Sequence, residues 1–261
     1  MVKPVYSGNV HDVYELSEDK LIIVATDRMS VHGNIIPWTI KNKGIYLTKI
    51  SNFWFQKTKD IIQNHIIETD INNMPSAFHN SSFFGRTVMV KKLKILPYEF
   101  IVRGYMYGRL WKSYQKGENL CGIVIPKRKY CLAEKLEYPI LTPTIKLDHS
   151  RDVDIDIHLV EKDLGKSNYE MIQKVCIELF NRVQSYFEDK DLIIADTKFE
   201  FGVDKKGDII LADEIFTADS SRYWDLKTYS VGKNPNSFDK DELRRWLTDQ
   251  QINGKYQYDK I

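Results

Sequence analysis

The feature of this chain that most restricts its fold is a polar–apolar alternation from Lys198 to Val203. A buried-type run, Leu192 to Ala195, precedes it, and Asp204 to Gly207 follows with the composition of a tight turn. Asp208 to Asp213 then returns with a second apolar run. Successive side chains of a strand point to opposite faces, so this pattern predicts a β-hairpin.

One face of the predicted hairpin collects charged side chains. Asp196, Lys198 and Glu200 share that face, and the intervening Phe199 and Phe201 point toward a core. These positions follow from the period of two alone.

Closing the hairpin about Lys205-Lys206 sets Lys198 opposite Asp213 and Glu200 opposite Leu211. The surface then holds three carboxylates and one ammonium, and hard oxygen ligands favour Mg²⁺. A solvated face of alternating charge gives the same pattern, and that alternative stays open.

A short glycine loop lies near the N-terminus. Ser7-Gly8-Asn9 separates the strand-like runs Val2 to Tyr6 and Val10 to Leu16. Glycine lets backbone N–H groups approach a phosphate closely, although an ordinary hairpin turn has the same composition.

The rest of the chain mixes helices and strands. A helix is expected over about Ile45 to Asn64, and a strand over Arg86 to Leu96 that ends at Pro97, the candidate hinge. Lys127 to His149 is expected to be irregular because of its prolines.

A second helix is predicted after a capping box of Ser167 and Glu170. Its apolar stripe is expected to be core: Ile172, Val175, Cys176, Leu179, Val183 and Phe187.

Arginines supply candidate anion contacts. Ser220 and Ser221 stand beside Arg222, while Arg103 and Arg109 flank a pair of glycines. Guanidinium and hydroxyl groups suit a phosphate or carboxylate, although each arginine alone also fits a surface charge or a salt bridge.

Composition narrows the function classes. The 261 residues carry a formal net charge of +2 and lack a basic stripe with interleaved aromatics, so no nucleic-acid partner is expected. Three cysteines without CxxC spacing argue against a disulfide framework and a zinc site. With no apolar segment long enough for a bilayer, a cytoplasmic protein without a membrane partner is expected.

Taken together, the motifs resemble the SAICAR synthetase family. The resemblance runs in order through most of the chain, and the IADTKFEFG motif is highly specific for that family. The matching segments are YSGNVHDVY near the start, ATDRMS at Ala25 to Ser30, KGIYLTKISNFWF at Lys43 to Phe55, LPYEFIVRGYMYGRLWKSY at Leu96 to Tyr114, LTPTIK at Leu141 to Lys146, IIADTKFEFG at Ile193 to Gly202 and DEIFTADSSRYWD at Asp213 to Asp225.

The resemblance implies an α+β, two-lobed fold that is distantly similar to kinases and ATP-grasp enzymes. A mainly antiparallel β lobe, residues 1–97, would bind ATP, and an α/β lobe, residues 98–261, would bind substrate and metal. The phosphates of ATP would lie under the loop of Gly8, Asn9, Val10 and His11, and its adenine at the strand end of Lys91, Lys92 and Leu93.

It also implies an ATP- and Mg²⁺-dependent ligase of purine biosynthesis. Such an enzyme joins the carboxylate of a carboxyaminoimidazole nucleotide to the amine of L-aspartate. By position, Glu200 and Asp213 match the metal-facing carboxylates, and Asp196 and Lys198 match polar residues beside the reacting centre. Substrate contacts are expected at Ser30, Arg103, Arg109, Ser220 and Arg222, of which Arg103 and Arg222 match residues that hold the phosphate of the nucleotide.

Several family positions are changed. Asn9 replaces a lysine, His11 stands where a basic residue is common, and Gly33 replaces an acid. Arg109 replaces a hydroxyl residue, and Arg151 replaces a histidine. The departures leave two alternatives open: a paralogous amide ligase with a different acid or amine, and a non-catalytic nucleotide-binding relative. The sequence does not define an oligomeric state.

Overall fold

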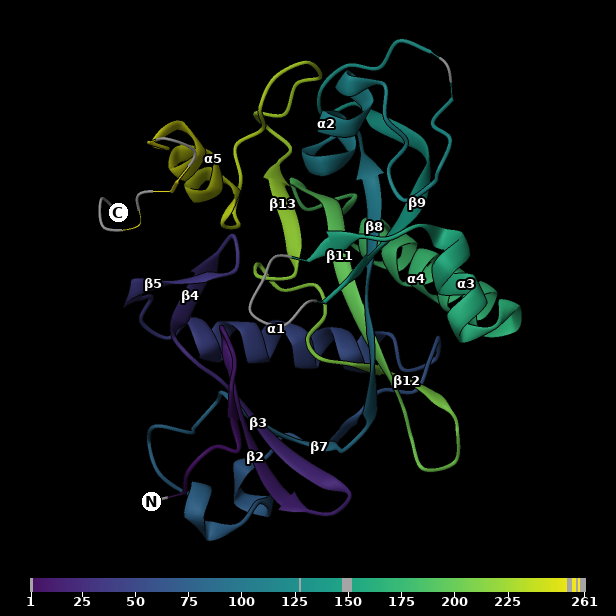
Figure 1. Cartoon of the computed structure of the whole chain (residues 1–261). Coiled ribbons are helices and arrows are strands. Elements are labelled where there is room, and N and C mark those ends of the chain that lie inside the picture. Colours follow the sequence, from purple (N-terminus) through teal and green to yellow (C-terminus); the bar gives the residue numbers. More distant parts are fainter. Residues whose placement is uncertain (1, 127, 147–151, 253–254, 257, 259–261) are drawn as a thin grey trace. The chain divides into compact units, whose positions relative to one another are not determined.

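The computed structural model of the chain (Figure 1) describes residues 2–126, 128–146, 152–252, 255–256 and 258. The chain divides into two compact units: one takes the described residues within Met1–Leu96, Phe201–Asp219 and Glu242–Ile261, and the other those within Pro97–Glu200 and Ser220–Asp241. The predicted division at residue 97 and the binding roles assigned to the two lobes remain predictions. Within the described ranges, none of the helices combines the length and the apolarity that a membrane crossing needs.

The first unit is built on an antiparallel sheet. Its strands run in the order β1 (Tyr6–Ser7), β2 (His11–Ser17), β3 (Lys20–Ala25), β7 (Thr87–Lys91) and β6 (Ile66–Glu68). β2, β3 and β7 pack Tyr14, Ile22, Val24 and Met89 into one apolar cluster with Met74 and Phe78. This cluster includes Phe78 from the short 3₁₀ turn Ser76–Phe78, which follows a similar turn at Ile71–Asn73.

A separate hairpin pairs β4 (Arg28–Val31) with β5 (Asn34–Thr39). His32 and Gly33 form its turn with φ angles of 52° and 80°. Two consecutive positive φ angles match the twist of a two-residue hairpin, and glycine adopts them without strain. The glycine at position 33 therefore has a local structural reason.

Helix α1 (Lys43–Lys57) is shorter at its C-terminus than the predicted span, and Thr58 is its C-cap. The Thr58 hydroxyl donates to the Trp54 carbonyl at 2.7 Å, and its backbone N–H donates to the same oxygen. Near the start of the helix, Gly44 lies against β3: a Cβ at this position would lie 2.1 Å from the Ala25 carbonyl oxygen. Only glycine permits that approach.

The second unit contains the longest strands. Its sheet runs β10 (Val153–Asp154), β9 (Lys135–Ile145), β8 (Lys94–Tyr105) and β11 (Leu192–Val203), and β13 (Ser221–Asp225) also pairs with β11. The β9–β10, β8–β9 and β11–β13 pairs are antiparallel.

The predicted strand end at Pro97 is wrong. β7 ends at Lys91, and β8 begins at Lys94 and continues through Pro97, whose carbonyl accepts from the Lys146 N–H at 3.1 Å. The prediction of an irregular segment from Lys127 to His149 is also wrong, since β9 occupies 135–145. Two prolines interrupt the strand pattern in sequence, but β9 pairs with β10 only at Thr144 and Ile145, so its upstream prolines are tolerated. Residues 127 and 147–149 lie outside the described ranges.

The described residues of the second unit form three helices: α2 (Gly108–Lys116), α3 (Ile157–Leu164) and α4 (Lys166–Phe187). α4 packs closely on β8, because a Cβ at Gly104 would lie 2.8 Å from the Phe180 ring. The predicted stripe is confirmed as core except at its end: Ile172, Cys176, Leu179 and Val183 are fully buried and Val175 is nearly so, whereas Phe187 is only partly buried.

The predicted capping box of α4 is wrong. The helix begins after Gly165, whose φ of 81° turns the chain directly from α3 into α4, and this N-cap makes no side-chain hydrogen bond. Ser167 and Glu170 therefore lie inside the helix.

The predicted hairpin after β11 is present. The Asp204 N–H donates to the Asp208 carbonyl at 3.0 Å, Gly207 takes a φ of 89°, and β12 (Ile209–Ala212) pairs with β11. Phe199 and Phe201 are fully buried, as predicted. Helix α5 (Asp241–Asp249) follows the end of β13 by a loop, and Leu247 joins a cluster with Met29, Val31 and Ile36.

Candidate active site

The glycine loop of the first unit is held in a fixed shape by its own backbone. The Gly8 N–H donates to the His11 carbonyl at 2.8 Å, and a Cβ on Gly8 would lie 3.3 Å from that oxygen. Arg28 adds an anchor: its Nη2 donates to the Gly8 carbonyl at 2.9 Å and to Asp12 Oδ1 at 2.7 Å. The Gly8 N–H is thus already engaged, so a phosphate would have to meet N–H groups further along the loop.

The ATDRMS segment is tied to the start of α1. Asp27 accepts from the N–H groups of Asn42 and Gly44, both at 3.1 Å, and from Arg86 Nη1 at 2.9 Å. Burial acts to raise the pKa of Asp27, but these hydrogen bonds outweigh it and the pKa is lowered. Ser30, a predicted substrate contact in this segment, is buried in β4 opposite Ile35.

His11 faces two carboxylates of the same unit. Its Nδ1 lies 4.0 Å from Asp213 Oδ1 and its Nε2 lies 3.9 Å from Glu214 Oε2. An imidazole at these distances forms ion pairs only when it is protonated, unlike a lysine or arginine side chain. Sequence reasoning missed Glu214, which directly follows Asp213.

The predicted strand through Asp213 is wrong at its last residue. β12 ends at Ala212, and Asp213 has a φ of 61°, in the left-handed region. Strand alternation therefore does not fix where the Asp213 side chain points. The predicted pairing of Asp213 with Lys198 stays a prediction.

A small cavity lies beside these groups. It measures about 30 Å³, and its polar lining includes His11, Arg86, Asp213 and Glu214. That volume holds a water molecule and not a nucleotide. Nearby, the pKa of the fully buried His65 is lowered to about 4 by burial, so this ring is neutral at pH 7.

The strand end predicted to take adenine is well ordered by backbone contacts. The Lys91 N–H donates to the His65 carbonyl and the Lys92 N–H to the Asp19 carbonyl, both at 2.8 Å. The Lys92 side chain pairs with Glu15. Leu93 packs on Gly202, where a Cβ would lie 2.7 Å from it. The adenine contact itself stays a prediction.

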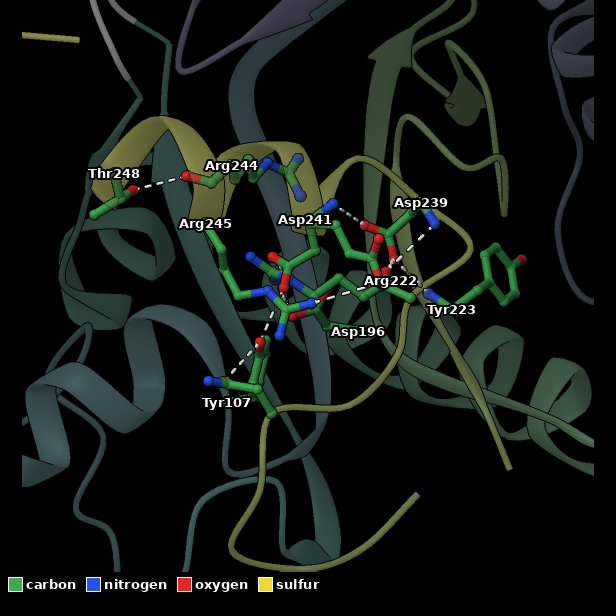
Figure 2. Close-up of polar contacts among 12 residues, drawn as sticks. Tyr107, Asp196, Arg222, Tyr223, Asp239, Asp241, Arg244, Arg245 and Thr248 are labelled. Carbon is green, nitrogen blue, oxygen red and sulfur yellow. Dashed lines mark hydrogen bonds and ion pairs between the residues drawn. The ribbon is translucent and has the colours of Figure 1, made fainter. Parts of the chain in front are cut away.

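In the second unit, three of the predicted residues come together around one carboxylate. Asp196 Oδ2 accepts from Arg222 Nη1 at 2.5 Å and from Arg103 Nη1 at 3.5 Å (Figure 2 labels Asp196 and Arg222). Asp196 and Arg222 are opposite each other in the β11–β13 pair, and Arg103 Nε also donates to the Thr142 hydroxyl at 2.9 Å. Asp196 and Arg103 are buried.

Both guanidinium groups stay charged in this setting. Burial lowers the pKa of Arg103, and Asp196 opposes that effect. Burial also acts to lower the pKa of Arg222, but Asp196 and Asp241 outweigh it and the pKa is raised. The two guanidinium groups face two carboxylates, Asp196 and Asp241, so these four side chains sum to no net charge. Binding of an anion here would depend on the directed N–H groups of the arginines and not on surplus positive charge.

Four residues further along β11, Glu200 lies between two lysines. Lys146 Nζ and Lys198 Nζ both contact its carboxylate, and Lys198 Nζ also lies 3.2 Å from Glu99 Oε1. Glu99 accepts from the Thr144 hydroxyl at 3.1 Å. Sequence reasoning missed Lys146 and Glu99 as members of this site.

The pKa values of Glu99 and of the neighbouring Asp152 are shifted in opposite directions. Burial acts to raise the pKa of Glu99, but Lys198 and Lys146 outweigh it and the pKa is lowered. Burial raises the pKa of Asp152, and the adjacent Glu99 raises it further.

The donor set tests whether magnesium fits. Among the described residues no group of three or more histidine, cysteine, aspartate or glutamate side chains forms a metal site. Mg²⁺ in phosphate chemistry, however, is usually held by one or two carboxylates together with phosphate oxygens and waters. The buried Glu200 in one unit and the partly exposed Asp213 in the other are carboxylates of that kind, and their role as Mg²⁺ ligands stays a prediction.

The remaining predicted substrate contacts differ in setting. Arg109 is half-exposed, and it donates to Asp154 Oδ1 at 2.8 Å and to the Asp152 carbonyl at 2.9 Å. Ser220 is buried, and its carbonyl accepts from the Lys198 N–H at 2.9 Å. Arg151 lies outside the described residues.

Comparisons with known proteins identify the family of this chain. Residues 4–261 match the model of the SAICAR synthetase family. The chain is 42% identical over 250 residues to the phosphoribosylaminoimidazole-succinocarboxamide synthase of Lachnospira eligens, covering 93% of this chain and 84% of that one. It is 40% identical over 257 residues to the enzyme of the same name from Cyberlindnera jadinii, covering 95% and 84%.

The solved structures that this chain resembles belong to the same family. The SAICAR synthase of Saccharomyces cerevisiae complexed with SAICAR superposes with a TM-score of 0.85 at 35% identity, covering 99% of this chain and 89% of that one. A SAICAR synthetase in complex with ADP gives 0.70 at 27% identity, covering 92% and 89%. The fold is α+β, as predicted. With a family match along almost its whole length and relatives at about 40% identity, this chain belongs to the SAICAR synthetase family.

Proposed function

We propose that this protein is an ATP-dependent ligase of de novo purine biosynthesis. It joins the carboxylate of carboxyaminoimidazole ribonucleotide to the amine of L-aspartate and yields SAICAR, ADP and phosphate. The observation that carries this proposal is the match to enzymes of that name along nearly the whole chain. A cytoplasmic location is part of the same proposal.

The reaction needs an activated carboxylate. A substrate carboxylate oxygen attacks the γ-phosphorus of ATP, ADP leaves, and the acyl phosphate accepts the amine of aspartate at its carbon with loss of phosphate. Such chemistry depends on positioning and on neutralising charge rather than on covalent help from the protein.

The buried arginines of the second unit support the substrate half of the proposal. Arg103 and Arg222 would hold the phosphate of the nucleotide, while Asp196 keeps both guanidinium groups in one place. Ser220 and Arg109 are the further contacts proposed for this substrate, and Ser30 is proposed from the first unit.

The lysines beside Glu200 support the reacting half. Lys198 and Lys146 would neutralise negative charge on the carboxylate and on the transferring phosphoryl group. Glu200 and Asp213 would hold Mg²⁺, which supplies charge neutralisation at the phosphates of ATP when bound.

The first unit is proposed to bind ATP. The ordered loop from Gly8 to His11 would cover the phosphates, and the strand end from Lys91 to Leu93 would contact the adenine. A SAICAR synthetase solved with ADP supports nucleotide binding in this family.

A second candidate is a paralogous amide ligase with a different acid or amine. The departure at Arg151, where the family pattern has a histidine in a substrate-facing segment, favours it. Asn9 and His11 do not separate the candidates, because their loop is assigned to the phosphates of ATP, which both ligases would use. Two other departures weigh less, since Gly33 fits a hairpin turn and Arg109 pairs with Asp154.

One assay separates the candidates. The protein is incubated with Mg-ATP, carboxyaminoimidazole ribonucleotide and aspartate, and ADP release and product mass are followed. We expect ADP and SAICAR in equal amounts. ADP release with another carboxylate or amine, but no SAICAR, would establish the paralogous ligase. Absence of Mg-ATP binding by calorimetry would leave only a non-catalytic relative.

A further inference from the structure

Arg222 is held on three sides by residues of its own unit. Its Nη1 donates to Asp196, its Nε donates to Asp241 Oδ1 at 3.1 Å, and its guanidinium carbon lies 5.7 Å from the centre of the Tyr107 ring (Figure 2). Neither Tyr107 nor Asp241 belongs to the residues predicted from sequence.

Asp241 is itself fixed in place. Its carboxylate is buried, and Oδ2 accepts from the Tyr107 hydroxyl at 2.9 Å. Asp239 holds the backbone, because its Oδ1 accepts from the Asp241 N–H at 2.7 Å and its Oδ2 accepts from the Tyr223 N–H at 2.8 Å. Tyr223 directly follows Arg222 in β13, so the strand that carries the arginine also positions its carboxylate partner.

The two carboxylates restrict which edge of the guanidinium is available. Asp196 and Asp241 take Nη1 and Nε, and among the described residues no hydrogen bond engages Nη2. Nη2 lies beside Gly108, where a Cβ would lie 3.3 Å away. Gly108 also has a φ of 59°, so a side chain there is disfavoured by the backbone as well as by the arginine.

We propose that Asp241, with Tyr107, is a positioning residue that turns the Nη2 edge of Arg222 toward the phosphate of the nucleotide substrate. The inference rests on the proposed function, since it takes Arg222 as a phosphate contact. Orientation, and not charge alone, is the contribution of Asp241, because its Oδ1 accepts from Arg222 Nε and its Oδ2 accepts from the Tyr107 hydroxyl. An asparagine can keep both contacts, because its oxygen accepts from Nε and its amide donates to the tyrosine oxygen.

The test compares Asp241→Ala, Asp241→Asn and Tyr107→Phe with wild type and Arg222→Ala. We expect Asp241→Ala to raise KM for carboxyaminoimidazole ribonucleotide by roughly tenfold, the usual effect of losing a hydrogen bond to a charged group. KM for ATP should stay unchanged, and Asp241→Asn should stay within about threefold of wild type. Tyr107→Phe should give an intermediate increase. A purely structural role would move all substrates alike.

The affinity of each variant for ribose 5-phosphate, measured by calorimetry, gives the same comparison without turnover. This measurement also covers a variant that binds the nucleotide but does not react. Asp189→Ala and Tyr138→Phe, at exposed positions of the same unit, are the matched controls, and thermal unfolding shows that each variant is folded.

The outcomes separate the two proposals. If Arg222→Ala weakens binding of the nucleotide and of ribose 5-phosphate while Asp241→Ala does not, the positioning role is refuted and the proposed function stands. If Asp241→Asn is as damaging as Asp241→Ala, charge and not orientation is the contribution, and the inference fails. If Arg222→Ala changes neither KM nor ribose 5-phosphate binding, Arg222 is not a phosphate contact and the inference falls with that assignment.

Discussion

Strand β11 carries two buried carboxylates, each between two cations, and the cations differ. Asp196 lies between Arg103 and Arg222, whereas Glu200 lies between Lys146 and Lys198. Guanidinium groups are planar forks that fix direction, while ammonium groups are mobile point charges. The centre with Arg103 and Arg222 is therefore suited to hold one anion in a defined orientation. The centre with Lys146 and Lys198 is suited to neutralise negative charge that shifts from one group to another during a reaction.

Exposure sharpens the contrast. The Arg103 side chain is 4% exposed, whereas 43% of the Lys146 side chain is exposed. A cation that can rehydrate tolerates loss of its partner better than one that cannot. We call Arg103, Asp196 and Arg222 the arginine centre, and Lys146, Lys198, Glu200 and Glu99 the lysine centre. We expect the arginine centre to contribute more to the stability of the protein and the lysine centre more to turnover.

The largest expected effect comes from Glu200→Gln. The substitution keeps shape but removes the charge proposed to face Mg²⁺, and turnover should fall by at least about a hundredfold. Steady-state kinetics with a Mg²⁺ titration measure this, and Glu178→Gln on the exposed face of α4 is the control. Near-normal activity of Glu200→Gln would refute the metal assignment.

The next effect concerns the arginine centre. Asp196→Asn leaves Arg103 buried without its charged partner, and breaking a buried ion pair of this kind costs about 3 kcal/mol of unfolding free energy. Urea unfolding of Asp196→Asn and Glu200→Gln compares the two centres directly. Equal losses of stability would remove the distinction between them, and Asp189→Asn serves as the exposed control.

Exchanging the cations tests geometry alone. Arg222→Lys keeps the charge but loses the fork, and KM for the nucleotide should rise roughly tenfold. The opposite change, Lys146→Arg, should stay within about threefold because that side chain is half-exposed and acts as a point charge. Similar KM values for the two variants would show that the type of cation is unimportant.

The smallest effect is the pH dependence of the lysine centre. Lys198 and Lys146 lower the pKa of Glu99 despite its burial. A carboxyl whose pKa is lower in the folded state adds stability above its unfolded pKa and loses it as pH falls through the folded value. Removing this carboxyl by Glu99→Gln should therefore make stability fall less steeply as pH drops below about 4.5, the ordinary pKa of a glutamate. An unchanged acid limb in urea unfolding would contradict the assignment.

The sequence predicted what local periodicity controls. The alternation along β11 correctly placed Phe199 and Phe201 in the core, on the face of the strand opposite to Lys198 and Glu200. It failed at Asp213, because a left-handed residue ends the strand and no periodicity reports that backbone change.

Members of the site that come from other strands were harder to predict. Glu99 shares a face with Arg103 by the same period of two, so this signal was present in the sequence. Lys146 follows β9, and its place beside Glu200 depends on strand order and register, which short-range patterns do not encode. Asp241 depends on the loop between β13 and α5, for which the sequence offers no periodic signal.

The contact between Gly44 and Ala25 has a consequence for how this chain can vary. A side chain at position 44 would push into a backbone carbonyl, which cannot rotate away as another side chain can. Gly207 also has a restricted backbone but has open space around it. In a saturation library selected for folded protein, position 44 should return glycine alone, whereas position 207 should also accept asparagine and aspartate, the residues most tolerant of positive φ.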